Sequence, residues 1–138
     1  MEPFPARSAV AASCTSSFRV SCGAVMDGTG LAEFFPEDRR TTLDDVKVAK
    51  PDPEAYLRAA GTIGVPAMEC VALEDSAPGV GSAVAAGYGL VIGVLSTSAG
   101  AHVTFPSTVA AVEFLLAEGG GKSASELASS AGAGAAKL

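Results

Sequence analysis

The sequence has few cysteines, a single histidine and a shortage of positive charge, and each shortage excludes a class of protein. The three cysteines, Cys14, Cys22 and Cys70, are odd in number and show no Cys-x-x-Cys spacing. They indicate reduced thiols, and neither a disulfide framework nor a zinc site. His102 is the only histidine, which excludes a mechanism that needs two. Nine Lys and Arg stand against fifteen Asp and Glu, so the net field disfavours a nucleic-acid or polybasic membrane contact.

Long hydrophobic runs are also missing. No apolar run approaches the roughly 20 residues that span a bilayer. Residues 1–7 contain two prolines and no hydrophobic segment, so we expect no secretory signal. Together with reduced thiols, this predicts a cytoplasmic protein. A peroxisomal alternative stays open, because Ala136-Lys137-Leu138 resembles the Ser-Lys-Leu signal with Ala in place of Ser.

Apolar patterning gives the main structural signal. With 138 residues and 49% apolar composition, the chain is long enough for one compact domain and too short for two ordinary ones. Apolar runs predict buried strands at 8–13, 70–73 and 90–94. Helices are predicted at 51–63, 80–86 and 107–117, with a looser helical pattern at 18–30 and a minor strand and turn at 41–46. Because apolar strands alternate with helices, we expect an α/β fold whose parallel sheet of three to four strands is covered on both faces.

The end of the chain has a different composition. Residues 119–138 are rich in Gly, Ala and Ser and carry few apolar anchors. Such a segment buries too little surface to offset the entropy cost of ordering it. We therefore expect a core domain over residues 1–118 and a disordered tail over residues 119–138.

Two adjacent carboxylates, Glu74 and Asp75, follow the predicted strand at 70–73. Open α/β sheets bind ligands at the carboxyl ends of their strands. Hard oxygen ligands suit Mg²⁺, which takes one or two carboxylates together with substrate phosphate. The alternative is that the pair only caps the next helix and meets solvent.

A lysine, Lys50, stands directly before the proline-started helix at 51–63. A fixed positive charge near a helix N-terminus is a suitable place to bind phosphate or to steady a carboxylate. The alternative is an exposed lysine before an ordinary helix.

The order of these motifs resembles the carboxyl-terminal half of the haloacid dehalogenase-like (HAD-like) superfamily. Lys50-Pro51-x-Pro53 is followed by a strand that ends in Glu74-Asp75-Ser76-x-x-Gly79-Val80. Upstream, Val10-Ala11-Ala12-Ser13 resembles the strand whose terminal Ser or Thr binds phosphate in that family. The likeness runs from about residue 8 to residue 94 and is most similar to the subgroup of β-phosphoglucomutases and small sugar-phosphate phosphatases.

The resemblance implies a partial Rossmann-like core without the family's cap domain, and it implies roles for four residues. Ser13 would bind the phosphoryl group, and Lys50 would neutralise charge on that group and on the nucleophile. Glu74 and Asp75 would hold Mg²⁺. The ligand of the completed site would be a small phosphorylated metabolite, with no nucleic acid or membrane as partner.

The nucleophile is the feature that the resemblance does not supply. In the family it is the first Asp of an Asp-x-Asp-Gly-Thr motif, which forms an aspartyl-phosphate. Here Met26-Asp27-Gly28-Thr29 is similar, but Val25 stands two residues before Asp27 and cannot attack phosphorus. We therefore expect no turnover of phosphomonoesters by this chain alone. Three explanations stay open: a truncated gene model, a half-domain whose exposed sheet edge is completed by a partner chain, or a remnant that binds phosphate or metal without catalysis.

Overall fold

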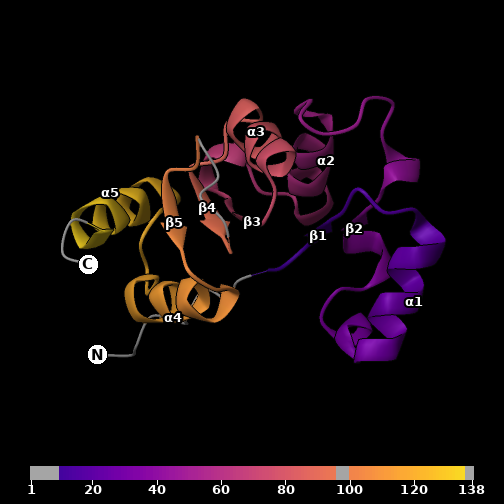
Figure 1. Cartoon of the computed structure of the whole chain (residues 1–138), viewed down its shortest axis with the longest axis horizontal. Helices are drawn as coiled ribbons and strands as arrows, with labels where there is room; N and C mark the ends of the chain where they lie inside the picture. Colours follow the sequence, from indigo (N-terminus) through magenta and orange to yellow (C-terminus); the bar gives the residue numbers. More distant parts are fainter. Residues whose placement is uncertain (1–9, 96–99, 136–138) are drawn as a thin grey trace.

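The computed structural model describes residues 10–95 and 100–135 (Figure 1). Its strands are β1 (Ser13–Cys14), β2 (Arg40–Thr41), β3 (Val71–Glu74), β4 (Leu90–Val94) and β5 (Val103–Phe105). Its helices are α1 (Arg19–Thr29), α2 (Glu54–Ile63), α3 (Ala77–Ala85), α4 (Thr108–Glu118) and α5 (Ala124–Ala135). Four short 3₁₀ turns, η1 (Leu31–Glu33), η2 (Glu37–Arg39), η3 (Leu43–Asp45) and η4 (Ala67–Glu69), connect them. The strands predicted at 70–73 and 90–94 are confirmed as β3 and β4, and the helices predicted at 51–63, 80–86 and 107–117 as α2, α3 and α4.

The strands form two separate parallel sheets. In the larger sheet the order is β3-β4-β5, with Val71 opposite Leu90 and Ile92 opposite Val103. In the smaller sheet β1 pairs with β2, with Ser13 opposite Arg40. The α/β class and a parallel sheet of three strands are therefore confirmed, and the structure adds a second, two-stranded sheet made of β1 and β2. Figure 1 shows β1 and β2 beside β3, on the side away from β4.

Helices cover both faces of the three-stranded sheet, so this part of the fold has three layers (Figure 1). Helices α2 and α3 pack on one face, in a core that includes Tyr56, Ala72, Val80 and Val91. Helices α4 and α5 pack on the other face, in a core that includes Leu90, Ile92, Ala111 and Leu127. Along β4 the side chains alternate between these two cores, as the pleat of a strand requires. Each helix among the described residues is too short or too polar to cross a lipid bilayer.

Helix α2 holds the two sheets together. It contacts β1 and β2 on one side and α3 on the other, and its residues Tyr56 and Ala60 belong to the core of the three-stranded sheet. The hydroxyl of Ser82 in α3 donates a 2.6 Å hydrogen bond to the carbonyl of Asp52, just before α2. Through these contacts, β1 lies near β3 although the two strands share no ladder.

The expectation of a disordered tail is wrong for residues 124–135, which form α5 and pack against β4 and β5. Its residues Ala124, Leu127 and Ala131 are each no more than 5% exposed. They recur at helical spacing, and two of the three are alanines, whose small side chains let the helix lie close to the sheet. The core domain therefore extends past residue 118. The Ala136-Lys137-Leu138 signal considered above lies outside the described residues.

Candidate functional site

A pocket of about 250 Å³ lies where the carboxyl ends of β1 and β3 come together. It is lined by residues from these two strand ends and from the loop before α2, namely Cys14, Thr15, Ser16, Lys50, Leu73, Glu74, Asp75 and Ser76. Pockets for drug-sized ligands usually measure roughly 300–1,000 Å³. This pocket therefore suits a smaller, polar ligand, at the end of the strands where open α/β folds bind their ligands.

Lys50 connects the two sides of the pocket. Its Nζ donates a 3.0 Å hydrogen bond to the backbone carbonyl of Cys14, at the end of β1. The same atom forms a 2.6 Å ion pair with Oε1 of Glu74, at the end of β3. Both charged side chains are only 7% exposed, so their attraction is weakly screened by water. The predicted lysine is therefore a buried charge that joins the two sheets.

The Glu74 carboxylate is held from several directions. Its Oε1 accepts a second 2.6 Å hydrogen bond, from the hydroxyl of Tyr56, and its Oε2 lies 3.4 Å from the hydroxyl of Ser76. A side chain at position 79 would overlap this carboxylate, so glycine there allows Glu74 to approach the first turn of α3. The hydroxyl of Ser76 also caps that helix by accepting from the backbone N–H of Gly79.

Tyr56 lies beneath the ion pair. It is 5% exposed, and its ring packs edge-to-face on Tyr88 with 5.0 Å between the centroids. The Nζ of Lys50 lies 5.0 Å from the Tyr56 ring centroid. Burial, followed by the negative charge of Glu74 and the hydrogen bond to it, raises the pKa of Tyr56 well above its usual range. The Tyr56 hydroxyl therefore keeps its proton and acts as a donor.

Cys14 is the one thiol at the pocket. Burial raises its pKa to about 11, although the nearby Lys50 ammonium opposes this shift. A thiol is nucleophilic mainly as the thiolate, and Cys14 is protonated near neutral pH. The sulfur is therefore a poor candidate for a nucleophile.

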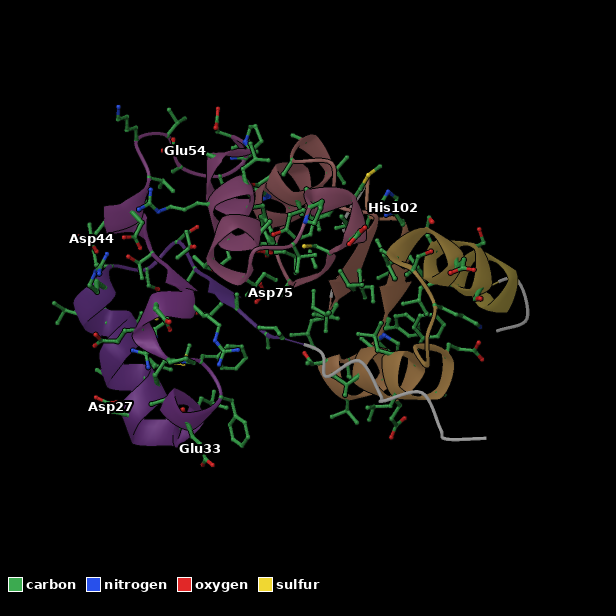
Figure 2. The ribbon with its side chains drawn as sticks, turned by 180° about the vertical axis from the view of Figure 1, so that it is seen from behind. Asp27, Glu33, Asp44, Glu54, Asp75 and His102 are labelled. Carbon is green, nitrogen blue, oxygen red and sulfur yellow. The ribbon has the colours of Figure 1, made fainter. Side chains whose placement is uncertain are left out.

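Three of the four predicted site residues meet at this pocket, because Lys50, Glu74 and Asp75 all line it. Figure 2 shows Asp75 near the middle of the molecule, whereas Asp27 lies on α1 at one end. Asp27 is thus part of a helix and does not follow a strand. The similarity of Met26-Asp27-Gly28-Thr29 to the family's nucleophile motif does not extend to its structural setting.

Ser13 is not among the residues that line the pocket. Its Oγ is buried and has no hydrogen-bond partner among the described residues. The hydroxyls at the pocket from this strand end belong to Thr15 and Ser16, which the sequence indicated only as part of a polar turn. Tyr56 was also missed as a site residue, because its position matches the apolar face of a helix.

The donor set fits a hard cation in part. Glu74 and Asp75 place adjacent carboxylates at the pocket, and Mg²⁺ commonly binds one or two carboxylates together with water and phosphate oxygens. Within residues 10–95 and 100–135, no three His, Cys, Asp or Glu side chains gather in a way that could hold a metal. Lys50 and the two carboxylates leave a formal charge of −1 at the pocket. An anionic phosphate would therefore need a cation to offset this charge.

The chain is an α/β protein in which a lysine from the loop before α2 meets two carboxylates at the carboxyl ends of parallel strands, the edge where open α/β proteins bind their ligands. Comparison with known families identifies the class more narrowly. The family of haloacid dehalogenase-like hydrolases matches residues 6–87, more than half of the chain. The chain therefore belongs to the haloacid dehalogenase-like hydrolases.

Individual relatives match parts of the chain. Hexitol phosphatase A from Escherichia coli is 48% identical over 46 residues, which are 33% of this chain and 21% of that protein. The structure of CbbY from Rhodobacter sphaeroides in complex with phosphate is 29% identical, with a TM-score of 0.60, over 68% of this chain and 44% of that chain. A HAD family hydrolase from Deinococcus radiodurans with bound phosphate and sodium is 27% identical, with a TM-score of 0.65, over 75% of this chain and 49% of that chain. The matches span only 15% to 23% of the length of the curated relatives.

Proposed function

We propose that this chain carries the phosphate- and metal-binding part of a Mg²⁺-dependent phosphatase or phosphomutase that acts on small sugar phosphates. The observation that carries the proposal is the buried Lys50 ammonium, fixed between the Cys14 carbonyl and the Glu74 carboxylate at the pocket. Membership of the hydrolase family supports it, as do a relative named hexitol phosphatase A and two similar structures that contain phosphate.

Each residue at the pocket has a role in this proposal. Lys50 neutralises charge on the phosphoryl oxygens, and hydroxyls at the end of β1 donate hydrogen bonds to them. Ser13 remains the predicted donor, and its buried Oγ without a partner is consistent with a binding role. Glu74 and Asp75 would hold Mg²⁺, which when bound supplies positive charge for the phosphate.

Calorimetric titration with inorganic phosphate tests this binding role. Because the pocket has a formal charge of −1, we expect measurable phosphate binding with Mg²⁺ and at least tenfold weaker binding without it. Asp75→Asn should abolish the effect of Mg²⁺. Asp27→Asn, which changes an exposed carboxylate on α1, should leave it unchanged. Equal phosphate affinity with and without Mg²⁺ would contradict the proposed metal role.

We further propose that the chain alone turns over no phosphomonoester, because its 138 residues contain no Asp-x-Asp and positioning cannot replace a nucleophile. Hydrolysis of p-nitrophenyl phosphate with Mg²⁺ measures this directly. Turnover in the wild type that disappears in Asp75→Asn but persists in Asp27→Asn would show that the chain is itself a phosphatase.

The split sheet favours one alternative, in which a partner chain completes the domain. The backbone N–H of Thr15 donates a hydrogen bond to the carbonyl of Thr41 in β2. The N–H and carbonyl of Cys14 therefore face away from β2, and the Cys14 carbonyl accepts from Lys50 instead. On β3 the Cys70 carbonyl bonds to Leu90 in β4. The peptide groups of the next residue therefore face away from β4. Along both strands, alternate peptide groups thus face away from their sheet and pair with no strand among the described residues.

A peptide can test this alternative. A synthetic segment of five apolar residues followed by Asp-x-Asp-Gly-Thr would supply both a strand and the family's nucleophile. Completion predicts a 1:1 complex by light scattering and Mg²⁺-dependent hydrolysis of p-nitrophenyl phosphate. A peptide with Asn in place of the first Asp is the matched control, and it should bind without restoring hydrolysis. No complex with either peptide would favour the non-catalytic binding remnant.

For location we propose the cytoplasm, supported by the three free thiols. A fluorescent reporter preceding residues 119–138, with and without Leu138, separates this from the peroxisomal alternative. Cytosolic signal from both versions would remove the peroxisomal alternative.

A further inference from the structure

The hydroxyl of Tyr56 does not line the pocket but contacts the Glu74 carboxylate that does, and neither family likeness nor sequence pattern assigns it a role. We propose that Tyr56 is a positioning residue, whose hydroxyl fixes the Glu74 carboxylate so that the carboxylate holds the Lys50 ammonium at the pocket. This inference rests on the proposed phosphate-binding function. It concerns how the lysine is kept in place, and not which substrate is bound.

The geometry at one oxygen atom carries the argument. Oε1 of Glu74 accepts from the Lys50 ammonium and from the Tyr56 hydroxyl, each at 2.6 Å. A carboxylate oxygen has two lone pairs, so these two donors complete its capacity. Without the Tyr56 donor, Oε1 would be held by Lys50 alone, and the buried carboxylate could rotate about its last torsion, because Oε2 has only the long 3.4 Å contact with Ser76. Rotation would move the anion that holds Lys50.

Tyr56 is itself held rigidly, as a positioning residue must be. The Tyr88 hydroxyl donates a 2.7 Å hydrogen bond to the Tyr56 carbonyl, and the two rings are in edge-to-face contact. The Tyr56 ring also lies 5.0 Å from the Lys50 Nζ, where it attracts the ammonium through its face. Tyr56 therefore contacts both members of the ion pair, from a helix that packs against the two-stranded sheet and contributes to the core of the three-stranded sheet.

Removal of one hydroxyl separates positioning from packing. Tyr56→Phe keeps the ring, its contact with Tyr88 and its attraction for the ammonium, and deletes only the donor to Glu74. Tyr88→Phe is the matched control, since it deletes the other buried tyrosine hydroxyl, whose partner is a backbone carbonyl. If both hydroxyls serve stability alone, the two variants should lose thermal stability to a similar degree and bind ligand alike.

The first measurement is the affinity for inorganic phosphate in the presence of Mg²⁺. A hydrogen bond to a charged group corresponds to a factor of roughly 10 to 100 in an equilibrium constant, and only part of that effect reaches phosphate, since it acts through Glu74 and Lys50. We therefore expect Tyr56→Phe to bind phosphate about three- to tenfold more weakly than wild type, and Tyr88→Phe to bind within twofold of wild type. Equal phosphate affinity in Tyr56→Phe and Tyr88→Phe would overturn the proposal.

The second measurement needs no ligand. The Lys50 side chain is 7% exposed, so its ammonium protons should exchange slowly enough to give a side-chain ¹H–¹⁵N signal in NMR spectra. We expect this signal to shift or broaden in Tyr56→Phe and to be unchanged in Tyr88→Phe. An unchanged Lys50 signal in Tyr56→Phe would overturn the proposal. A changed signal in a protein that binds no phosphate would support positioning by Tyr56 and refute the proposed function instead.

Discussion

Replacement of Lys50 by methionine tests whether the ion pair with Glu74 is as deeply embedded as the structure indicates. Lys50→Met keeps a long flexible side chain but removes the ammonium. The Glu74 carboxylate then remains 7% exposed without its cation, with Tyr56 as its remaining short-range donor. A buried charge left without its partner destabilises the folded state far more than a surface charge does.

The expected loss follows from that burial. When one partner of a buried ion pair is removed, the free energy of unfolding typically falls by about 3–5 kcal/mol. Because the Tyr56 hydroxyl continues to solvate the carboxylate, we expect about 3 kcal/mol, the lower end of that range. Small domains unfold in urea with an m-value of about 2 kcal/mol per molar. The urea midpoint of Lys50→Met should therefore fall by about 1.5 M.

The chain contains a matched control for this measurement. Lys122 pairs with Glu118 at 2.7 Å on the surface, with 38% and 44% of the two side chains exposed. Lys122→Met should change the free energy of unfolding by no more than about 1 kcal/mol. The double variant Lys50→Met/Glu74→Gln should recover most of the loss, because glutamine is neutral and still accepts from Tyr56. A Lys50→Met loss no larger than that of Lys122→Met would refute this account of the pair.

Three further outcomes follow from single contacts. Gly79→Ala should lower the free energy of unfolding by about 1–3 kcal/mol, because the added Cβ overlaps the Glu74 carboxylate. Gly28→Ala is the control and should not lower it, because a Cβ at that position on α1 meets open space. Equal urea midpoints for the two variants would contradict the overlap. Burial raises the pKa of the Cys14 thiol from 9.0 to about 11. The thiol should therefore resist alkylation at pH 8, which peptide mapping measures. Its contribution to the free energy of unfolding should be complete below pH 9 and lost as pH rises toward 11. Rapid alkylation of native protein at pH 8 would contradict that burial. Leu127→Ala should cost about 2–5 kcal/mol in urea unfolding, whereas no loss would mean that α5 does not pack on the sheet.

Much of the site was predictable because its residues are close in sequence to the elements that position them. Glu74 and Asp75 follow an apolar strand directly, and Lys50 precedes a proline-started helix, so local pattern places all three at element ends. The Tyr56 contact was not predictable in this way. A tyrosine on the buried side of a helix fits the apolar pattern whether or not its hydroxyl meets a carboxylate 18 positions away.

The parts of the fold that local pattern missed depend on long-range pairing or on small side chains. β5 has only three residues and exists through its pairing with β4, which no local signal specifies. Helix α5 has a Gly-, Ala- and Ser-rich composition typical of disorder, and its order depends on a narrow stripe around Leu127 that packs on the sheet. The separation of β1 from β3 likewise depends on which strands pair, and pairing is determined by tertiary contacts and not by local sequence.

The pair of tyrosines beneath the pocket also makes the site visible to spectroscopy. The chain has no tryptophan, and Tyr56 and Tyr88 are its only tyrosines. Both are in one edge-to-face pair, and one of them is hydrogen-bonded to the carboxylate that holds the lysine. The tyrosine bands of the near-ultraviolet circular dichroism spectrum thus arise from this one place. A phosphate or cation titration can be followed there without any added label, and a change in these bands with the far-ultraviolet spectrum constant would report movement at the pocket alone.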